Sequence, residues 1–167
     1  MKILVLSDSH SALSFMRLCI DRVKPDAVIH LGDYFGDGAA MAEEYPRIPF
    51  YQVPGNCDRS HEVFGSPETL VETVCGVRLY MTHGHRQGVK YSLGPLIRDA
   101  ASANVQAVLF GHTHSAYCER EDNMWVVNPG SCGYFGGSAA IITVYGGKIA
   151  GCRIIRQPEL EDMFWPL

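Results

Sequence analysis

Two histidines with one residue between them, His112 and His114, follow the apolar run at positions 107–110. The run predicts the end of a buried strand. The chain turns just past such an end, so both imidazole rings can face the crevice at the carboxyl edge of a sheet. Imidazoles in that place would bind a divalent metal. Taken alone, the motif is explained equally well by surface or hydrogen-bonded histidines.

The same form, an apolar strand followed by metal-type ligands, recurs at four other places in the chain. These places supply carboxylate, imidazole and amide groups at Asp8 and His10, Asp33, Asn56, and His83 and His85. Five of the chain's seven histidines therefore lie at predicted strand ends. Histidines scattered over a surface would not gather in this way, so the sequence favours a metal site.

The types and the number of these donors restrict the metal. Carboxylate, imidazole and amide donors without a thiolate suit Mn²⁺, Fe²⁺ or Zn²⁺ rather than Mg²⁺ or Ca²⁺, which prefer oxygen donors alone. Seven or eight such side chains are too many for one ion and sufficient for two. A carboxylate that bridges two cations offsets their repulsion, and we expect Asp33 to be that bridge. Taken alone, Asp8 and Asp33 would be interpreted as helix caps or turn residues.

Strands and helices alternate in the N-terminal part of the chain. Apolar strands are predicted at 2–7, 27–31 and 50–53, with a helix that runs from its expected N-cap, Ser11, to Val23 and a short helix at 39–45. A strand–helix–strand unit of this spacing implies parallel pairing and a right-handed crossover. The donors Asp8, Asp33 and Asn56 would then lie at one edge of a sheet.

The C-terminal half of the chain is rich in hairpins. Strands are predicted at 69–74, 77–82, 107–110, 124–127, 139–145 and 148–156, with one helix at 92–103 and a strong turn signal at Gly146-Gly147. Two mixed sheets packed face to face, with helices outside, accommodate both the strand–helix–strand units of the N-terminal half and the hairpins of the C-terminal half. The predicted fold class is therefore α/β, a four-layer α/β/β/α sandwich of two mixed β-sheets flanked by helices, with residues 1–167 as a single domain.

The composition is typical of a globular protein without a strongly charged partner. Of the 167 residues, 47% are hydrophobic and 19% are charged, and the net charge is -4, so we expect no strong affinity for nucleic acid and no membrane partner. The apolar run 3–6 is too short for a signal peptide, and six cysteines without a C-x-x-C pair indicate reduced thiols; the expected location is cytoplasmic. The tail, with Met163, Phe164 and Trp165, is expected to pack on the domain, with a homodimer contact as the alternative.

Five blocks of this sequence resemble those of a known family. Asp8-Ser9-His10, Gly32-Asp33, Gly55-Asn56-Cys57-Asp58, His83-Gly84-His85 and Gly111-His112-Thr113-His114 are similar, in this order, to the blocks of the calcineurin-like metallophosphoesterase superfamily. The short length and the Asn56-Cys57-Asp58 variant resemble the small prokaryotic YfcE-like phosphodiesterase branch. The resemblance covers nearly the whole chain, and the family's α/β/β/α sandwich agrees with the fold predicted above.

The resemblance implies a dinuclear metal centre. Asp8, His10, Asp33 and His114 would hold one ion, and Asp33, Asn56, His83 and His112 would hold the other. It also implies an enzyme that hydrolyses a small phosphodiester with a metal-bridging hydroxide as the nucleophile, so that no serine or cysteine attack is required. Mn²⁺ is the expected metal, with Fe²⁺, Zn²⁺ or Ni²⁺ as alternatives.

The same resemblance assigns several residues around these blocks. Many family members carry a histidine, linked to the leaving group, where this chain has Cys57, and a thiol with a pKa of about 8.5 replaces a proton donor poorly. Asn56, Asp58 and His85 are the candidate catalytic residues: His85 is the substitute acid and Asp58 orients a neighbouring group. Structural support is the alternative for His85 and Asp58. Ser131 lies in a loop similar to one that lines the family's site and is assigned to the substrate side, against an ordinary turn.

Two histidines fall outside the blocks, and two other functions stay open. His30, inside an apolar strand, is expected to be buried beside the site, and His61 to lie on the surface or to touch substrate. The first alternative function is a non-catalytic protein-binding scaffold that resembles the retromer subunit of this fold and would be expected to have lost metal ligands. The second is a mononuclear metal-binding or sensing module. Substrate identity would depend on the loops at 36–41, 59–67 and 86–93.

Overall fold

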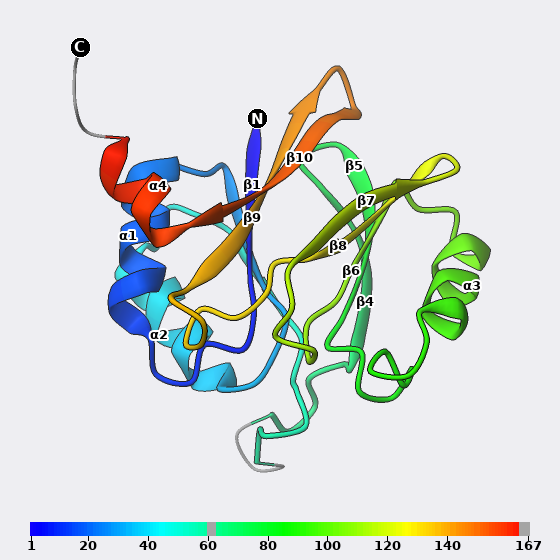
Figure 1. The fold of residues 1–167 in the computed structure, drawn as a ribbon, viewed down its shortest axis with the longest axis horizontal. Coiled ribbons are helices and arrows are strands. Elements are labelled where there is room, and N and C mark those ends of the chain that lie inside the picture. Colours follow the sequence, from blue (N-terminus) through cyan, green and yellow to red (C-terminus); the bar gives the residue numbers. More distant parts are fainter. Residues whose placement is uncertain (60–62, 164–167) are drawn as a thin grey trace.

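The computed structural model describes residues 1–59 and 63–163, so the predictions for His61, Phe164 and Trp165 lie outside the described residues. Within these ranges the chain forms two five-stranded sheets with helices on their outer faces (Figure 1). The elements follow one another as β1 Lys2–Leu6, α1 Leu13–Val23, β2 Ala27–His30, α2 Phe35–Glu44, β3 Phe50–Gln52, β4 Thr69–Val74, β5 Val77–Thr82, α3 Gly94–Ser102, β6 Ala107–Leu109, β7 Tyr117–Glu121, β8 Met124–Asn128, β9 Ser138–Tyr145, β10 Lys148–Arg156 and α4 Gln157–Asp162.

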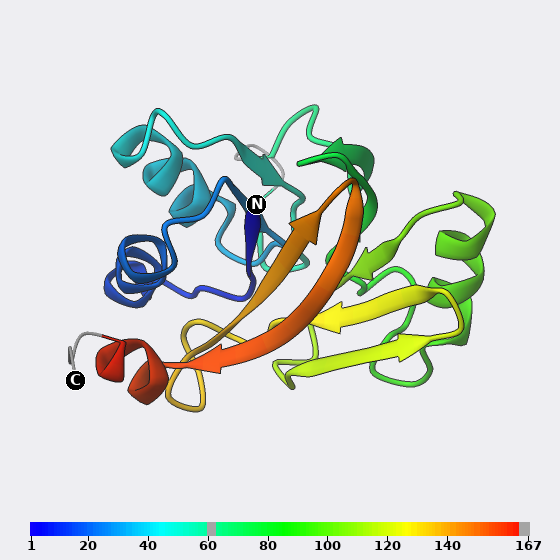
Figure 2. The same cartoon turned by 90° about the horizontal axis from the view of Figure 1, so that it is seen from above.

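The first sheet has the order β10-β9-β1-β2-β3, and its strands β1, β2 and β3 run parallel. Side chains alternate across β1, as they must in a strand. Leu4 and Leu6 pack with the buried residues of α1, α2 and α4, whereas Ile3 and Val5 face the second sheet. The three helices therefore cover the outer face of this sheet (Figure 2).

The second sheet has the order β4-β5-β6-β8-β7, with β5, β6 and β8 parallel and the two outer strands antiparallel to their neighbours. Its outer face is covered by α3, whose Leu96 and Ala100 pack against Val108 and Val126 of the sheet. Its inner face contributes Leu79, among others, to the core shared with the first sheet.

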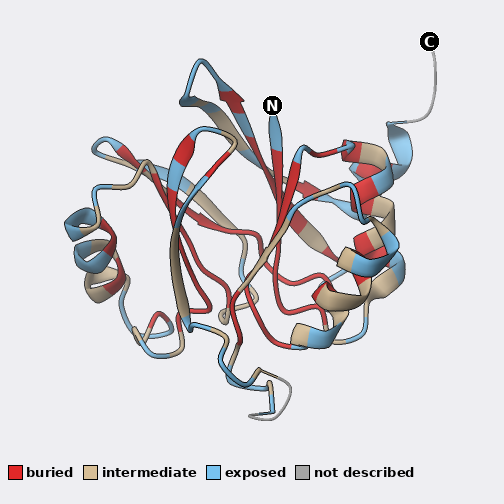
Figure 3. Cartoon of the chain, turned by 180° about the vertical axis from the view of Figure 1, so that it is seen from behind, coloured by how far each residue is buried: buried red, intermediate tan, exposed pale blue. Residues whose placement is uncertain are grey.

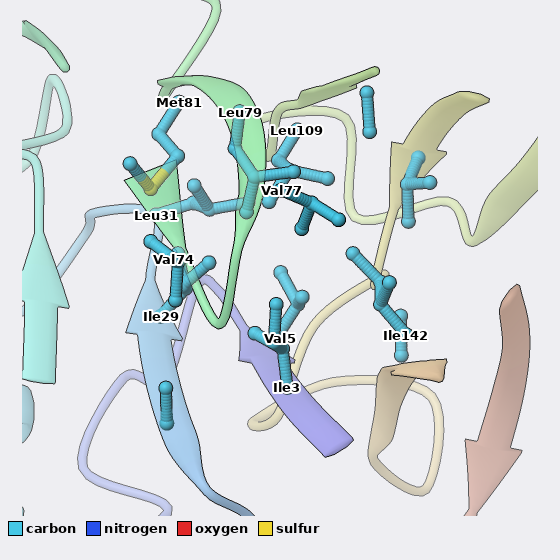
Figure 4. Packing of buried hydrophobic residues seen from close by; sticks show 14 of the residues in the cluster. Ile3, Val5, Ile29, Leu31, Val74, Val77, Leu79, Met81, Leu109 and Ile142 are labelled. Carbon is cyan, nitrogen blue, oxygen red and sulfur yellow. The ribbon is translucent and has the colours of Figure 1, made fainter. Parts of the chain in front are cut away.

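The main core lies between the two sheets (Figure 4). Its side chains come from the inner faces of both, and the strands that carry them are the most deeply buried part of the chain, while the outer faces of the helices are exposed (Figure 3). Ile3, Val5, Ile29, Leu79 and Leu109 have no exposed surface. Burying apolar area of this kind is the main stabilising term, at about 25 cal/mol per Å². The predicted four-layer α/β/β/α sandwich is confirmed.

Some predicted boundaries are wrong. The N-cap of α1 is Ala12 rather than Ser11, because Ser11 has a φ of 68° and donates its backbone N–H to the Asp37 carboxylate. The second helix begins at Phe35, not at position 39. The sequence pattern does not indicate the edge strand β7 or the short helix α4, because the polar sequence of β7 shows no alternation and α4 is only six residues long.

None of the described helices is both long and apolar enough to cross a membrane.

Candidate metal centre

The predicted donors follow the carboxyl ends of parallel strands from both sheets. Asp8 and His10 follow β1, Asp33 follows β2, and Asn56 follows β3. His83 follows β5, and His112 and His114 follow β6. Because the strands that carry the donors are parallel within each sheet, these ends gather at one edge, at the bottom of Figure 1.

Hydrogen bonds join the ends of the two sheets, and two of them involve proposed metal ligands directly. The backbone N–H of His112 donates to Asp8 Oδ2 at 3.1 Å, and His83 Nδ1 lies 2.7 Å from the Leu31 carbonyl oxygen. The second contact fixes the tautomer of His83, because Nδ1 must carry the proton and Nε2 is then free to act as a donor to a metal.

Five of the predicted metal ligands have a left-handed backbone. The φ angles are 51° at Asp8, 43° at His10, 56° at Asp33, 66° at His112 and 59° at His114. This conformation is uncommon for residues other than glycine and persists where the surrounding structure enforces it, most often at functional sites. It also explains how the chain turns sharply enough at each strand end to bring these side chains together.

The first group of donors is compact and deeply placed. One donor atom from each of Asp8, His10, Asp33 and His114 lies within 4.8 Å of all the others. Asp8 Oδ1 and His114 Nε2 are 3.0 Å apart. Asp8 is 0% exposed and Asp33 is 2% exposed.

Two donor atoms of this group lack a hydrogen-bond partner. Asp8 Oδ1 and His10 Nε2 are buried, and no hydrogen bond reaches either atom within the described part of the chain. A buried polar atom without a partner costs about 1–3 kcal/mol. A divalent cation would satisfy both atoms at once, so this donor set fits the metal that the sequence predicts.

The second group shares Asp33 with the first. His83 Nε2 lies 3.5 Å from Asp33 Oδ1 and 3.2 Å from Asn56 Oδ1. The rings of His83 and His112 are 5.1 Å apart between centroids. Asp33 therefore lies nearer to the second group than Asp8 does, since Asp8 Oδ1 is 4.0 Å from His83 Nε2.

Burial disfavours protonation of two imidazoles of the site. Burial, together with the His83 ring, lowers the pKa of His112 to about 4, and burial together with His10 lowers the pKa of His114. Burial raises the pKa of Asp8. At Asp33 burial opposes ionisation, but the His83 ring and the Cys57 N–H outweigh it and hold the pKa below its ordinary value. A neutral imidazole is the form in which His112 and His114 could bind a metal.

Asp58 builds the loop that carries the donors. Its carboxylate accepts the backbone N–H groups of Asp33 at 3.1 Å, Phe35 at 2.7 Å and Gly55 at 2.7 Å. It therefore fastens the loop after β3 to the turn after β2. This arrangement favours the structural alternative for Asp58.

Ser131 has a similar supporting place on the other side of the site. Its hydroxyl donates to the Asp8 carbonyl oxygen at 2.8 Å and accepts the N–H groups of Gly133 and Tyr134, both at 3.1 Å. The side chain is 1% exposed, so it lies beneath the loop rather than on its substrate-facing surface.

Cys57 and His85 flank the second group of donors. Cys57 is exposed, and its N–H donates to Asp33 Oδ1 at 2.9 Å. Partial desolvation of the thiol, together with the neighbouring Asp33 carboxylate, raises the pKa of the thiol to about 11. The His85 ring lies 5.4 Å from that of His83 and 6.1 Å from that of His112. His85 Nδ1 is buried and no described group hydrogen-bonds to it.

His30 is fully buried behind the site, as its apolar strand predicts. Its Nε2 lies 3.0 Å from the hydroxyl of Ser9, the residue between Asp8 and His10. Burial lowers the pKa of His30 to about 4, so the ring is neutral at pH 7.

Sequence reasoning missed two tyrosines at the site. The Tyr34 and Tyr134 rings each meet the His10 ring edge-on at 4.9 Å, and Tyr134 also stacks on His114 at 5.0 Å. Both are close to half exposed. Nothing in the local sequence marks them except that Tyr34 follows Asp33 directly.

Comparison with known proteins agrees with this geometry. The model of the calcineurin-like phosphoesterase superfamily domain matches residues 1–146. A protein of Bacillus subtilis, the probable metallophosphoesterase YsnB, is 29% identical over 78% of this chain and 75% of its own. The phosphodiesterase MJ0936 of Methanocaldococcus jannaschii is 28% identical over 84% of this chain and 90% of its own.

Solved structures share the fold. The crystal structure of a predicted phosphoesterase from Streptococcus pneumoniae has a TM-score of 0.71 at 23% identity, covering 93% of this chain and 97% of its own. A Vps29 single mutant from Entamoeba histolytica has a TM-score of 0.69 at 19% identity, covering 94% and 99%. With a family domain matched over most of its length and that domain's fold around a cluster of metal-type donors, the chain belongs to the calcineurin-like phosphoesterase superfamily.

Proposed function

We propose that this protein is a metal-dependent phosphodiesterase with a dinuclear centre. As a member of the superfamily it is a hydrolase of phosphoric esters. The finer assignment, to small phosphodiesters, is supported by the relative from M. jannaschii that is named a phosphodiesterase. In this proposal residues 1–167 act as one metallophosphoesterase domain in the cytoplasm.

One observation carries the proposal above the others. Two buried donor atoms, Asp8 Oδ1 and His10 Nε2, have no hydrogen-bond partner among the described residues, although both lie in a four-residue cluster of donors. A fold that left these atoms unsatisfied without a cation would lose stability for no gain. The cluster is therefore best explained as a site built for metal.

The proposed ligands divide around Asp33. Asp8, His10 and His114 would hold one ion with it, and Asn56, His83 and His112 the other. When bound, two divalent ions lower the pKa of a water molecule between them and neutralise the charge on the phosphoryl oxygens. Mixed carboxylate and imidazole donors favour Mn²⁺, with Fe²⁺, Zn²⁺ and Ni²⁺ as alternatives.

The chain's own residues position the reacting groups. The Leu31 carbonyl holds His83 in one tautomer. Asp58 fixes the loop that carries Asn56, and Ser131 fixes the backbone of Asp8. His85 is the proposed proton donor to the leaving group, because a thiol with its pKa raised to about 11, as at Cys57, holds its proton at neutral pH.

A protein-binding scaffold is the second candidate, favoured by the fold shared with Vps29. At that level of identity the likeness concerns the fold alone. The presence of every predicted metal ligand, with four of them clustered, favours the enzyme. A mononuclear sensing module would need only one of the two donor groups.

The test is hydrolysis of bis(p-nitrophenyl) phosphate with Mn²⁺ added to metal-free protein. We expect wild-type activity and a loss of at least about 10³-fold in Asp33→Asn, since asparagine tolerates the left-handed backbone but cannot bridge two cations. Asp99→Asn, on the exposed surface of α3, is the matched control and should keep full activity. Folded wild-type protein that hydrolyses no phosphodiester with any of the four metals would overturn the proposal.

A further inference from the structure

A pocket of about 530 Å³ opens beside His10, next to the two groups of metal donors. Its volume falls in the range of small-molecule sites. It is lined by His10, Tyr34, Gly36, Asp37, Cys57, Asp58 and Arg59. Because His10 belongs to the first donor group, whatever fills this pocket lies directly beside the reacting phosphate.

Tyr34 gives the pocket an aromatic wall. Its ring is 45% exposed and touches His10 only edge-on, so a ring face is available for stacking. Its φ of 68° is costly for a bulky residue, by about 1–3 kcal/mol. The conformation persists because Asp58 binds the N–H groups on either side of Tyr34, those of Asp33 and Phe35. The backbone that carries the ring is thus held in place at the mouth of the site.

Arg59 gives the same pocket a positive charge. The two acids of the pocket are engaged elsewhere: Asp37 Oδ2 accepts the Ser9 hydroxyl at 2.7 Å and the Ser11 N–H at 2.8 Å, and Asp58 accepts three backbone N–H groups. No hydrogen bond or ion pair engages the Arg59 guanidinium within the ranges that the structure describes. A free guanidinium is suited to bidentate binding of a phosphate.

We infer that this pocket binds one arm of the phosphodiester substrate, and that this arm is a nucleotide whose base stacks on Tyr34 and whose second phosphate pairs with Arg59. The inference rests on the proposed function, which places the reacting phosphate beside His10. A 3′,5′-cyclic mononucleotide has a single phosphate and would leave Arg59 without a partner. The net charge of -4 disfavours binding of a long polyanion, so the substrate that supplies this arm is a dinucleotide or the end of a short oligonucleotide.

The experiment compares substrates that share one leaving group. Thymidine 5′-(p-nitrophenyl phosphate) and methyl p-nitrophenyl phosphate both release p-nitrophenolate and differ only in the retained arm. We expect wild-type kcat/KM to favour the thymidine arm, and Tyr34→Leu to reduce this preference about tenfold or more, which is the usual contribution of base stacking. If Tyr34→Leu does not fold, Tyr34→Asn removes the ring and tolerates the left-handed backbone.

The role of the Arg59 guanidinium is tested by adding a 3′-phosphate to the thymidine substrate. The added group should raise wild-type kcat/KM about tenfold and have less than a twofold effect in Arg59→Gln. Tyr145→Leu and Arg120→Gln, which change exposed residues at the far ends of β9 and β7, are the matched controls and should behave as wild type. A Tyr34 or Arg59 variant with wild-type preferences would overturn the inference while leaving the phosphodiesterase intact.

A binding measurement separates failure of the inference from failure of the proposed function. Thymidine 3′,5′-bisphosphate should bind the metal-free wild-type protein in calorimetry, and at least tenfold more weakly to Tyr34→Leu and to Arg59→Gln. Binding without hydrolysis of any diester would contradict the proposed function but keep the pocket. No binding, or equal binding to all three proteins, would overturn the nucleotide assignment. Competition by oligonucleotides of two to ten units distinguishes a dinucleotide substrate from the end of a longer oligonucleotide.

Discussion

At the scale of single residues, Asp33 connects the two donor groups. Its carboxylate lies with Asp8, His10 and His114 in one cluster and 3.5 Å from His83 Nε2 in the other. Its φ of 56° turns the chain at the end of β2, and Asp58 and the Cys57 N–H hold it in place. The sequence predicts Asp33 as the bridge from residue type and position. It does not predict the backbone conformation, which depends on partners 24 and 25 residues away.

The role of His85 predicts an effect that depends on the leaving group. A proton donor matters most when the departing group is basic, and general acid catalysis contributes about 10²–10⁴-fold. We expect His85→Gln to lower kcat about a hundredfold for a diester with an alkoxide leaving group, and by less than about tenfold for one that releases p-nitrophenolate. Steady-state kinetics with the two substrates measures the ratio.

Cys57→Ala is the comparison for this test. Because the pKa of the Cys57 thiol is raised to about 11, the thiol should not donate a proton at neutral pH, and its removal should change both rates by the same factor. An equal loss on both substrates in His85→Gln would mean that His85 only supports its neighbours.

The buried His30 predicts a pH dependence of stability. Its pKa is lowered from 6.5 to about 4 by burial, so below pH 6.5 the unfolded chain binds a proton that the native state does not. The contribution is therefore fully present above pH 6.5 and is lost as the pH falls towards 4, by about 2 kcal/mol at pH 5. We expect the free energy of unfolding, measured with urea, to fall less between pH 7 and pH 5 in His30→Gln than in the wild type. Parallel losses in the two proteins would contradict this account.

At the scale of elements, all the strands except the edge strand β7 follow from the sequence pattern, and the helix starts do not. β1 and β5 are nearly continuous apolar runs bounded by polar residues, so pattern and structure agree. Helix α2 begins at Phe35 although Gly36 and Gly38 lower its helix propensity, because Asp58 binds the N–H of Phe35. A contact between distant segments thus overrides the local preference. The same holds for Ser11, which binds Asp37 through its backbone instead of capping α1.

The close approach of two loops predicts that Gly55 cannot be replaced. A Cβ at Gly55 would lie 2.1 Å from Asp33 Oδ1 and 2.4 Å from the Asp33 backbone nitrogen. We expect Gly55→Ala to lower the free energy of unfolding by about 1–3 kcal/mol, as overpacking does, and to lower kcat/KM at least about a hundredfold by displacing the bridging carboxylate. Urea unfolding and diester hydrolysis measure the two effects.

Gly151→Ala is the matched control for Gly55→Ala. No atom lies within 4 Å of a Cβ built at Gly151 in β10, so this variant should keep both stability and activity. If Gly55→Ala behaved like Gly151→Ala, the loops after β2 and β3 would have to be further apart than the structure shows.

At the scale of the whole molecule, two sheets are needed to complete one site. Asp8 and Asp33 follow strands of the first sheet, and His83, His112 and His114 follow strands of the second. The core between the sheets therefore sets the distances between donors as well as the stability of the fold. The ordered blocks let the sequence predict this meeting of strand ends and the family. The sequence does not reveal Tyr34 and Tyr134 at the site, because their places follow from turns whose geometry exists only in the folded chain.

The most direct test of the account is a titration of metal-free protein with Mn²⁺, in which bound equivalents and hydrolysis of bis(p-nitrophenyl) phosphate are followed together. Because Asp33 joins two groups of donors, we predict two bound equivalents per chain and activity that develops as the second one binds. Full activity at one equivalent, or two bound equivalents without any hydrolysis, would contradict the dinuclear phosphodiesterase.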